Sequence, residues 1–292
     1  MSDRLVAWVL RVVWGVAPFT VWPAMGEALG HHSSGVHTAA AVGAWVVWAA
    51  VVLATFVPHP LGLTALRCTT PAVLVGAVAA VAGGRTGAFA ATGAVAWSAL
   101  VLILSLLPRT GLVFVNGPAY PNERRFPLAV PGPLLLGPLE VAWLAVVGLP
   151  VAGVMLLAGQ QWVLGSVATV AAGGAARYLG RPLHQLSRRW AVFVPAGLVL
   201  HDPMTLRDPV LFRRQIIDGL GPAPADTDSL DLTQGALGLA LELRLREKVP
   251  MARITSRRRT GEEGASARLL FTPSRPGAVL AEASRRSIRV AG

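Results

Sequence analysis

The strongest constraint on this chain is a series of long apolar runs that fills its first 180 residues. A helix needs about 20 mostly apolar residues to cross the hydrocarbon core of a bilayer, because lipid offers its backbone no hydrogen-bond partners. Six runs meet this requirement, and we expect a bundle of six transmembrane helices over Leu5–Met25, Thr38–Val57, Leu63–Val81, Gly87–Leu107, Leu134–Leu157 and Trp162–Leu179. The first run is long and rich in tryptophan, and no convincing small-residue cleavage site follows it, so we expect a span and not a cleaved signal peptide.

The charged residues divide the chain into two domains. Charged side chains make up 14% of the sequence, against roughly 25% in an ordinary soluble domain. Residues 1–180 contain 8 arginines and 4 acidic residues, whereas residues 181–292 contain 18 lysines and arginines and 11 acidic residues. We therefore expect a transmembrane helical domain over residues 1–182 and a basic, water-soluble domain over residues 183–292.

Arginines in the connections between the runs predict the orientation of the chain. Cytoplasmic loops of membrane proteins carry an excess of lysine and arginine. With six spans and the N-terminus inside, only Arg85 lies outside, and the cytoplasmic side receives the basic domain together with Arg4, Arg67, Arg109, Arg124 and Arg125. The strong preference for arginine over lysine indicates a GC-rich bacterial genome. We therefore expect a multi-pass protein of the bacterial cell membrane with both termini in the cytoplasm.

The connection from Pro108 to Pro133 is the one long loop of the membrane domain. It combines Tyr120 with the neighbouring Arg124 and Arg125. Tyrosine beside paired arginines is typical of the headgroup layer, which favours a loop at the membrane interface. The alternative is a docking surface for the C-terminal domain.

In the C-terminal domain the apolar residues recur with a period of two, which is typical of strands with one buried face. A hairpin is predicted over residues 190–200, and further strands over 211–217 and 267–271. The clearest alternation sets leucines against small or charged residues: Leu239, Leu241, Leu243 and Leu245 against Ala240, Glu242, Arg244 and Arg246. We expect the leucines to face a core and the others to face water. A helix capped by Ser274 then closes a mainly antiparallel β domain.

The order of these elements is similar to that of bacterial pleckstrin-homology-like (PH-like) domains, which are often attached to transmembrane helices. The resemblance covers approximately residues 188–290 and rests on three segments: LTQGALGLALELRL (Leu232–Leu245), ARLLF (Ala267–Phe271) and RPGAVLAEASRR (Arg275–Arg286). It implies a partly open β-barrel capped by a C-terminal helix, a fold used for binding and assembly instead of catalysis. The whole arrangement also resembles multi-span membrane proteins of actinobacteria.

The densest basic cluster of this domain consists of four arginines: Arg253, Arg257, Arg258 and Arg259. Beside a cytoplasmic leaflet each gains about 1 kcal/mol from anionic lipid, so the cluster is a candidate surface for membrane lipid or a protein partner. A solvated loop that only helps to orient the chain is the simpler interpretation. We expect no nucleic-acid binding, because Glu262 and Glu263 follow at once and no aromatic platform accompanies the arginines.

Two charged residues fall within predicted spans, Arg11 in the first and Glu140 in the fifth. An unpaired ion in hydrocarbon is costly and turns toward a partner, so we expect Arg11 and Glu140 to form an intramembrane pair. The alternative is a small transporter or transport accessory that uses Glu140 and the glycine-rich spans.

The sequence offers few other candidates for chemistry. His31, His32 and His37 lie in the segment HHSSGVH, but their spacing matches no HExxH pattern, and we expect a polar loop without a metal or cofactor. No phosphate-binding glycine loop with its lysine and no Gly-x-Ser-x-Gly elbow is present. We therefore expect a non-enzymatic protein without catalytic residues, whose C-terminal domain binds lipid or a protein partner in a scaffold or regulatory role. A membrane enzyme is the least supported class.

Overall fold

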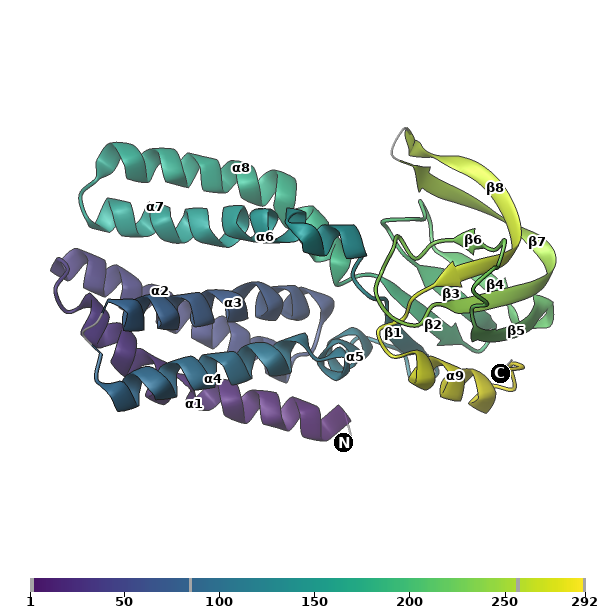
Figure 1. Cartoon of the computed structure of the whole chain (residues 1–292), viewed down its shortest axis with the longest axis horizontal. Helices are drawn as coiled ribbons and strands as arrows, with labels where there is room; N and C mark the ends of the chain where they lie inside the picture. The colour runs from purple at the N-terminus through teal and green to yellow at the C-terminus, as the bar shows by residue number, and fades with distance from the viewer. Residues whose placement is uncertain (1–2, 84–85, 256–257, 291–292) are drawn as a thin grey trace. The chain divides into compact units, whose positions relative to one another are not determined.

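The structure is a computed structural model that describes residues 3–83, 86–255 and 258–290 (Figure 1). The chain forms two units, and each unit is built from two separate chain segments. The helical unit contains Met1–Gly117 and Glu140–His184, and the β unit contains Pro118–Leu139 and Gln185–Gly292. The boundary after His184 lies close to the expected one at residue 182. The segment Pro118–Leu139, however, belongs to the β unit although it follows and precedes membrane-type helices in the chain.

Five helices are long and apolar enough to cross a membrane: α1 (Asp3–Leu29), α2 (Ser34–Phe56), α3 (Pro60–Ala82), α4 (Ala88–Leu106) and the compound helix Pro138–Ala158. Most of their apolar surface is not covered by protein. Only 11% of the most apolar window of α2, and 6% of that of the compound helix, is buried inside the structure. Water would disfavour such surfaces, so these five helices indicate a membrane protein.

The compound helix has an irregular centre. It begins as α6 (Pro138–Trp143), widens into the π-helical segment η2 (Leu144–Gly148) and continues as α7 (Leu149–Ala158). Pro150 accounts for the irregularity, because it has no N–H to donate to the carbonyl one turn earlier and its ring crowds that carbonyl.

The sixth predicted span forms a helix, α8 (Trp162–Leu186), that is not among the five candidate spans. Arg177 in its second half shortens its apolar run. Glycines bring α7 and α8 close together, since a Cβ at Gly153 would lie 2.7 Å from Thr169 Oγ1. Small residues allow such close approach between membrane helices.

Prolines within the helices release backbone carbonyls, and tryptophans bind some of them. Pro18 has no N–H for the Trp14 carbonyl, which instead accepts a hydrogen bond of 2.7 Å from Trp48 Nε1. Trp97 Nε1 donates to the adjacent Val13 carbonyl at 3.1 Å. The released Trp14 carbonyl would be costly in lipid, where no water replaces the lost donor, so the Trp48 bond stabilises the contact of α1 with α2. The Trp97 bond joins α1 to α4 in the same region.

The first sheet of the β unit has four antiparallel strands in the order β1-β2-β3-β4. They are β1 (Arg124–Pro127), β2 (Trp190–Val194), β3 (Gly197–His201) and β4 (Val210–Arg213). β2 and β3 form the predicted hairpin. β1 comes from the long connection, which begins as the helix α5 (Pro108–Asn116), and Phe126 packs against Phe193 with 5.7 Å between ring centroids. Of the two interpretations of that connection, the structure supports docking onto the C-terminal domain.

The second sheet has the order β5-β7-β8-β6. Its strands are β5 (Ile217–Pro222), β6 (Leu230–Asp231), β7 (Leu241–Thr255) and β8 (Arg258–Phe271). β6 pairs in parallel with β8, and the other pairs are antiparallel. The 3-10 turn η3 (Arg214–Ile216) divides the predicted strand over 211–217 into β4 and β5, and the helix α9 (Pro276–Arg285) follows β8. The expectation of a C-terminal sheet domain is confirmed.

The predicted alternation of β7 is confirmed for its three buried leucines, Leu241, Leu243 and Leu245. Two neighbouring predictions are wrong. Leu239 precedes the strand and is exposed, because β7 begins only at Leu241. Glu242 was expected to face water but is buried, because the loop before β6 covers that side of the strand.

Candidate functional site

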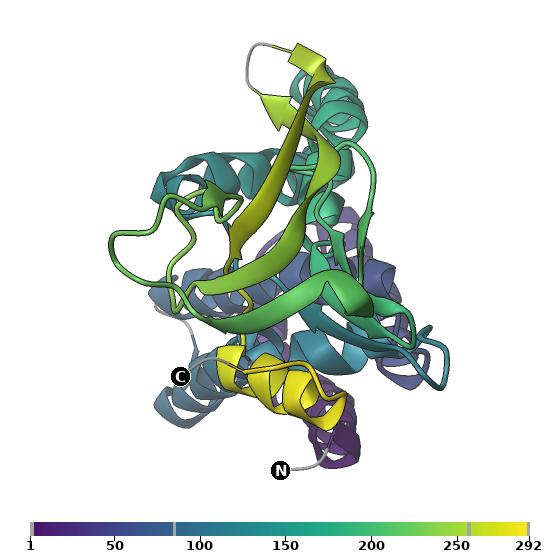
Figure 2. The ribbon, with the colours of Figure 1, turned by 90° about the vertical axis from the view of Figure 1, so that its right-hand side faces the viewer.

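The candidate binding surface is the two-stranded ribbon formed by β7 and β8 (Figure 2). β5 pairs with β7 only as far as Leu245. The register between β7 and β8 then shifts, and pairing resumes at Val249 opposite Ser266. From there outward the two strands pair with each other and extend beyond the rest of the β unit (Figures 1 and 2). Three members of the predicted arginine cluster, Arg253, Arg258 and Arg259, belong to this outer part.

Backbone contacts with the loop after β3 hold the outer part of β7 in place. Arg207 N–H donates to the Ala252 carbonyl at 2.9 Å, and Ile254 N–H donates to the Thr205 carbonyl at 2.8 Å. Between these two bonds, the buried Leu206 forms an isolated bridge with β7. The ribbon is therefore fixed to the β unit near its outer end.

Arg253 is the member of the predicted cluster whose side chain the structure describes. Its guanidinium lies against β8, where a Cβ at Gly264 would be 3.6 Å from Arg253 Nε. Arg253 Nε is buried and donates no hydrogen bond within the described part of the chain. Arg257 lies outside the described residues, and only the backbone of Arg258 and Arg259 is described. A guanidinium with an unused donor is suited to carboxylate or phosphate oxygens.

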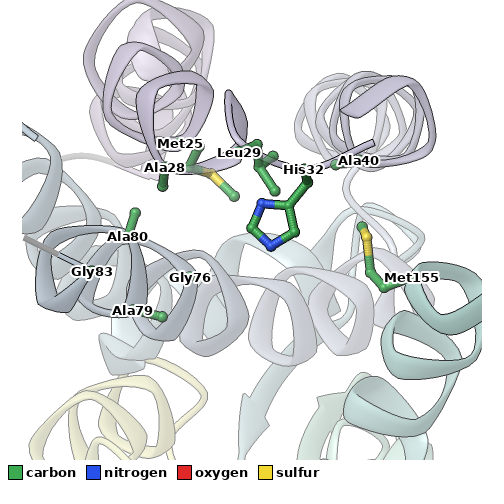
Figure 3. Close-up of a pocket in the computed structure, with 10 residues that line it drawn as sticks. All are labelled: Met25, Ala28, Leu29, His32, Ala40, Gly76, Ala79, Ala80, Gly83 and Met155. Carbon is green, nitrogen blue, oxygen red and sulfur yellow. The ribbon is translucent and has the colours of Figure 1, made fainter. Parts of the chain in front are cut away.

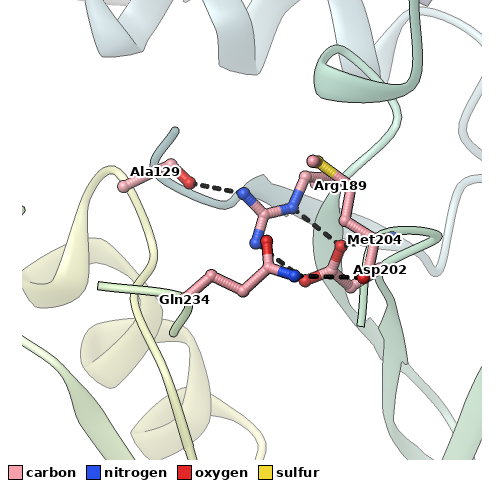
Figure 4. A network of polar contacts seen from close by, with 5 residues as sticks. All are labelled: Ala129, Arg189, Asp202, Met204 and Gln234. Carbon is pink, nitrogen blue, oxygen red and sulfur yellow. Dashed lines mark hydrogen bonds and ion pairs between the residues drawn. The ribbon is translucent and has the colours of Figure 1, made fainter. Parts of the chain in front are cut away.

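Arg189 forms a buried ion pair within the C-terminal segment of the β unit and a hydrogen bond to the other segment (Figure 4). Arg189 Nε and Nη2 donate to the two carboxylate oxygens of Asp202 at 2.7 and 2.8 Å. Arg189 Nη1 donates to the Ala129 carbonyl at 2.9 Å, which ties the connection after β1 to the hairpin. Asp202 Oδ1 also accepts a bond of 3.1 Å from Met204 N–H, a turn contact typical of aspartate. All three sets of contacts indicate a structural role.

This pair was not predicted, although the sequence contains a signal for it. The hairpin of β2 and β3 aligns Trp190 with His201. Arg189 and Asp202 are therefore the next cross-strand pair, where opposite charges stabilise a sheet.

Glu242 is a second buried charge with a structural role. Its Oε1 accepts hydrogen bonds from Thr227 Oγ1, at 2.7 Å, and from the Ser229 hydroxyl. Burial alone raises the pKa of Glu242, but the bonds from Ser229 and Thr227 and the charges of Arg244 and Arg268 outweigh it and hold the pKa below its usual range. Glu242 is thus a carboxylate that anchors the loop before β6.

The structure does not bring Arg11 and Glu140 together. Arg11 Nε and Nη2 donate to the Thr55 carbonyl at 3.3 and 3.2 Å, and the guanidinium lies 4.7 Å from the centre of the Phe56 ring. This carbonyl belongs to the last turn of α2, where carbonyls lack helical donors and cations are favourable. Glu140 is exposed in the first turn of α6, where a carboxylate is favourable. No ion pair joins the two across residues 3–83, 86–255 and 258–290.

The helical unit contains a pocket of about 410 Å³ (Figure 3). Its lining is apolar except for one imidazole: Met25, Ala28, Leu29, His32, Ala40, Gly76, Ala79, Ala80, Gly83 and Met155. Figure 3 shows the His32 ring within the pocket, between Met25 and Met155. His31 and His37 are exposed, as is His32. Among the residues that the structure describes, no three His, Cys, Asp or Glu side chains are grouped to hold a metal ion.

The comparisons with known proteins leave the site to be interpreted from its own geometry. No protein-family model, no curated protein and no solved structure matches the chain.

Proposed function

We propose that this chain is a multi-pass protein of the bacterial cell membrane whose β unit is a non-enzymatic binding module with a scaffold or regulatory role. The ligand in this proposal is an acidic surface, supplied by anionic lipid headgroups or by a protein partner. The proposed contact residues are those of the predicted arginine cluster: Arg253, Arg257, Arg258 and Arg259.

Arg253 supports this proposal most directly. Its buried Nε lacks an acceptor among the described residues, and the ribbon that carries it is fixed to the β unit. An unpaired buried donor costs about 1–3 kcal/mol, so an incoming carboxylate or phosphate oxygen recovers free energy that the isolated chain loses. Arg258 and Arg259 add positive charge on the neighbouring strand β8.

The two-segment origin of the β unit supports a topology of six spans, with α8 as the sixth. Pro118–Leu139 and Gln185–Gly292 form one folded unit, so both segments must lie on the same side of the membrane. The candidate span Pro138–Ala158 leaves that side, and α8 has to return to it. The excess of arginine on this side favours the cytoplasm for the β unit and for both termini.

The element order of the β unit supports the PH-like fold in this proposal. The resemblance implies strands followed by one C-terminal helix, and in this unit α9 follows the strands of two four-stranded sheets. The parallel pairing of β6 with β8 and the origin of β1 in a separate segment are features particular to this chain.

The test compares the wild-type chain with a cluster variant, Arg253→Gln/Arg257→Gln, and a matched control, Arg213→Gln/Arg214→Gln, in which two exposed arginines of the same unit are changed. Each full-length chain is purified from native membranes, and mass spectrometry identifies the lipids and proteins that remain bound. We expect the cluster variant alone to lose anionic lipid or one specific protein, and the class that is lost identifies the ligand. Identical recovery from all three chains would contradict the proposal.

A small transporter or transport accessory is the second candidate, and the pocket favours it. Gly76 and Gly83 line the pocket, in agreement with a role for glycine-rich spans, whereas Glu140 does not line it. Its volume and apolar lining are typical of small-molecule sites. Native mass spectrometry should then detect a small molecule on the wild type and on Gly93→Leu, where open space surrounds the glycine, but not on the pocket-filling variant Ala79→Leu. Retention by Ala79→Leu would exclude the pocket.

A further inference from the structure

Four of the exposed leucines of the β unit lie in two connecting segments. Leu135 and Leu136, in the 3-10 turn η1 (Gly132–Leu136), are 41% and 86% exposed. Leu237 and Leu239, in the loop between β6 and β7, are 74% and 49% exposed. Exposure of several large apolar side chains in one region indicates a surface that another molecule covers.

The two segments that carry these leucines contact each other through their backbones. Gly132 N–H donates to the Gly235 carbonyl at 3.2 Å. The approach is so close that a Cβ at Gly132 would lie 2.3 Å from the Gly235 oxygen, so only glycine fits. The four leucines therefore flank one contact, and we call them the leucine surface: Leu135, Leu136, Leu237 and Leu239.

Polar contacts hold the loop of Leu237 in a defined conformation. Asp231 Oδ1 accepts a bond of 2.7 Å from Thr233 N–H, and Gln234 Nε2 donates to the Met204 carbonyl at 3.0 Å (Figure 4). Gln234 itself has a left-handed φ of 54°, which a non-glycine residue adopts only where its surroundings require it. The conformation of this loop thus keeps Leu237 and Leu239 away from the core.

We propose that the leucine surface inserts into the boundary between the headgroups and acyl chains of the bilayer. The proposal rests on the membrane-surface role proposed above and names a second, apolar component of that contact. Such an insertion reaches about 5–10 Å into the membrane and requires apolar side chains at its tip, as at Leu237.

Chain continuity supports lipid as the occupant. Pro138, two residues after Leu136, begins the candidate span Pro138–Ala158, and residues that flank a span lie at the membrane interface. The Gly235 carbonyl is hydrogen-bonded to Gly132 N–H. The six residues from Gly132 to Pro138 span at most about 20 Å even when fully extended. The span therefore brings lipid close to this surface in every copy of the chain, whereas a protein partner would have to be supplied separately.

The single cysteine of the sequence makes a site-specific test possible. In a Cys68→Ala background, Leu237→Cys is labelled with an environment-sensitive fluorophore and the full chain is reconstituted in phosphatidylcholine vesicles, with or without spin-labelled lipid. Leu211→Cys on β4 is the matched control, since Leu211 is 41% exposed in the same unit. We expect blue-shifted emission at position 237 and quenching by spin-labelled lipid at least about twofold greater than at position 211.

Equal quenching at the two positions would overturn the proposal. Protection of the 237 probe from aqueous iodide without lipid quenching would also overturn it, because protein would then cover the surface. The vesicles contain no anionic lipid, so the arginine cluster is not required for a positive result. Failure of the arginine proposal and failure of the leucine proposal are thereby distinguishable.

Discussion

At the scale of single residues, the contacts of Arg189 connect parts of the β unit that are distant in sequence. Its guanidinium bonds to Asp202 in the same hairpin and to the Ala129 carbonyl, 60 residues earlier in the chain. A guanidinium has five N–H donors and stays charged at all relevant pH values, so it can satisfy both partners at once. This buried cation therefore adds a side-chain contact to the strand pairing that holds the segment of β1 against the hairpin.

We expect Asp202→Asn to lower the free energy of unfolding of the β unit by about 3–5 kcal/mol, because the change leaves Arg189 buried without its counter-ion. This loss is measured by urea unfolding of the purified full-length chain, with protease cleavage within the β unit as the signal of unfolding. Asp208→Asn is the control, since Asp208 is exposed and 3.9 Å from Arg207 Nε, and exposed pairs contribute little. Similar losses in both variants would argue against the assigned role.

The lowered pKa of Glu242 predicts a pH dependence of stability. A carboxyl whose folded pKa lies below its ordinary value of 4.5 contributes stability above that value and loses it as the pH falls through the folded pKa. The wild-type β unit should therefore lose stability in acid more steeply than Glu242→Gln, which lacks this titration. Urea midpoints at neutral pH and below pH 4.5 test the difference, and parallel acid profiles for the two chains would count against it.

At the scale of elements, prolines and tryptophans together define how α1 meets its neighbours. Pro18 interrupts the hydrogen bonding of α1, and Trp48 of α2 supplies the donor that the Trp14 carbonyl lacks. Pro18 is unfavourable without Trp48, because the Trp14 carbonyl then has no hydrogen-bond donor in lipid. The two residues should therefore be energetically coupled.

We expect Trp48→Phe to destabilise the helical unit by about 1 kcal/mol through the lost hydrogen bond, and by less in a Pro18→Ala background, where residue 18 again donates to the Trp14 carbonyl. Thermal unfolding in detergent of the wild type, the two single variants and the double variant gives the coupling free energy. Trp143→Phe serves as the control, because its indole Nε1 donates to the Cys68 carbonyl at 2.7 Å and its effect should not depend on residue 18. Additive effects of Trp48→Phe and Pro18→Ala would rule out the coupling.

At the scale of the whole molecule, the β unit is assembled from a connection between helices and from the C-terminal segment. In the proposed six-span topology, both segments lie on one side of the membrane, and the residues between them cross it twice. This assembly also means that the C-terminal segment alone lacks strand β1 and its aromatic contact at Phe126.

Residues 185–292 expressed alone should therefore fail to form the native sheet. A fusion of residues 118–139 to residues 185–292 through a short glycine and serine linker should restore the sheet, because the added segment supplies β1 and the Ala129 carbonyl. Chemical-shift dispersion in amide NMR spectra distinguishes the two chains, and a fusion with Phe126→Asp is the control. Native-like dispersion of 185–292 alone would show that β1 is dispensable.

The arginine cluster and the leucine surface differ in how well the sequence predicted them. Charge is visible in the sequence without any fold, so Arg253 and its neighbours were identified directly. Leu239 was instead assigned to the buried face of a strand, because its spacing matches that of Leu241 and Leu243. Only the point at which β7 begins separates the exposed leucine from the buried ones.

The sequence by itself predicted six apolar spans, of which the structure retains five as candidates, and also the β2–β3 hairpin and the buried leucines of β7. Local periodicity and turn residues specify such features. Tertiary structure alone decided the partner of Arg11, the burial of Glu242 and the position of β1. Each of these depends on residues far away in the chain, such as Thr55 for Arg11 and Phe193 for Phe126. Local patterns contain no information on such pairs, since the folded chain and not the spacing of residues brings them together.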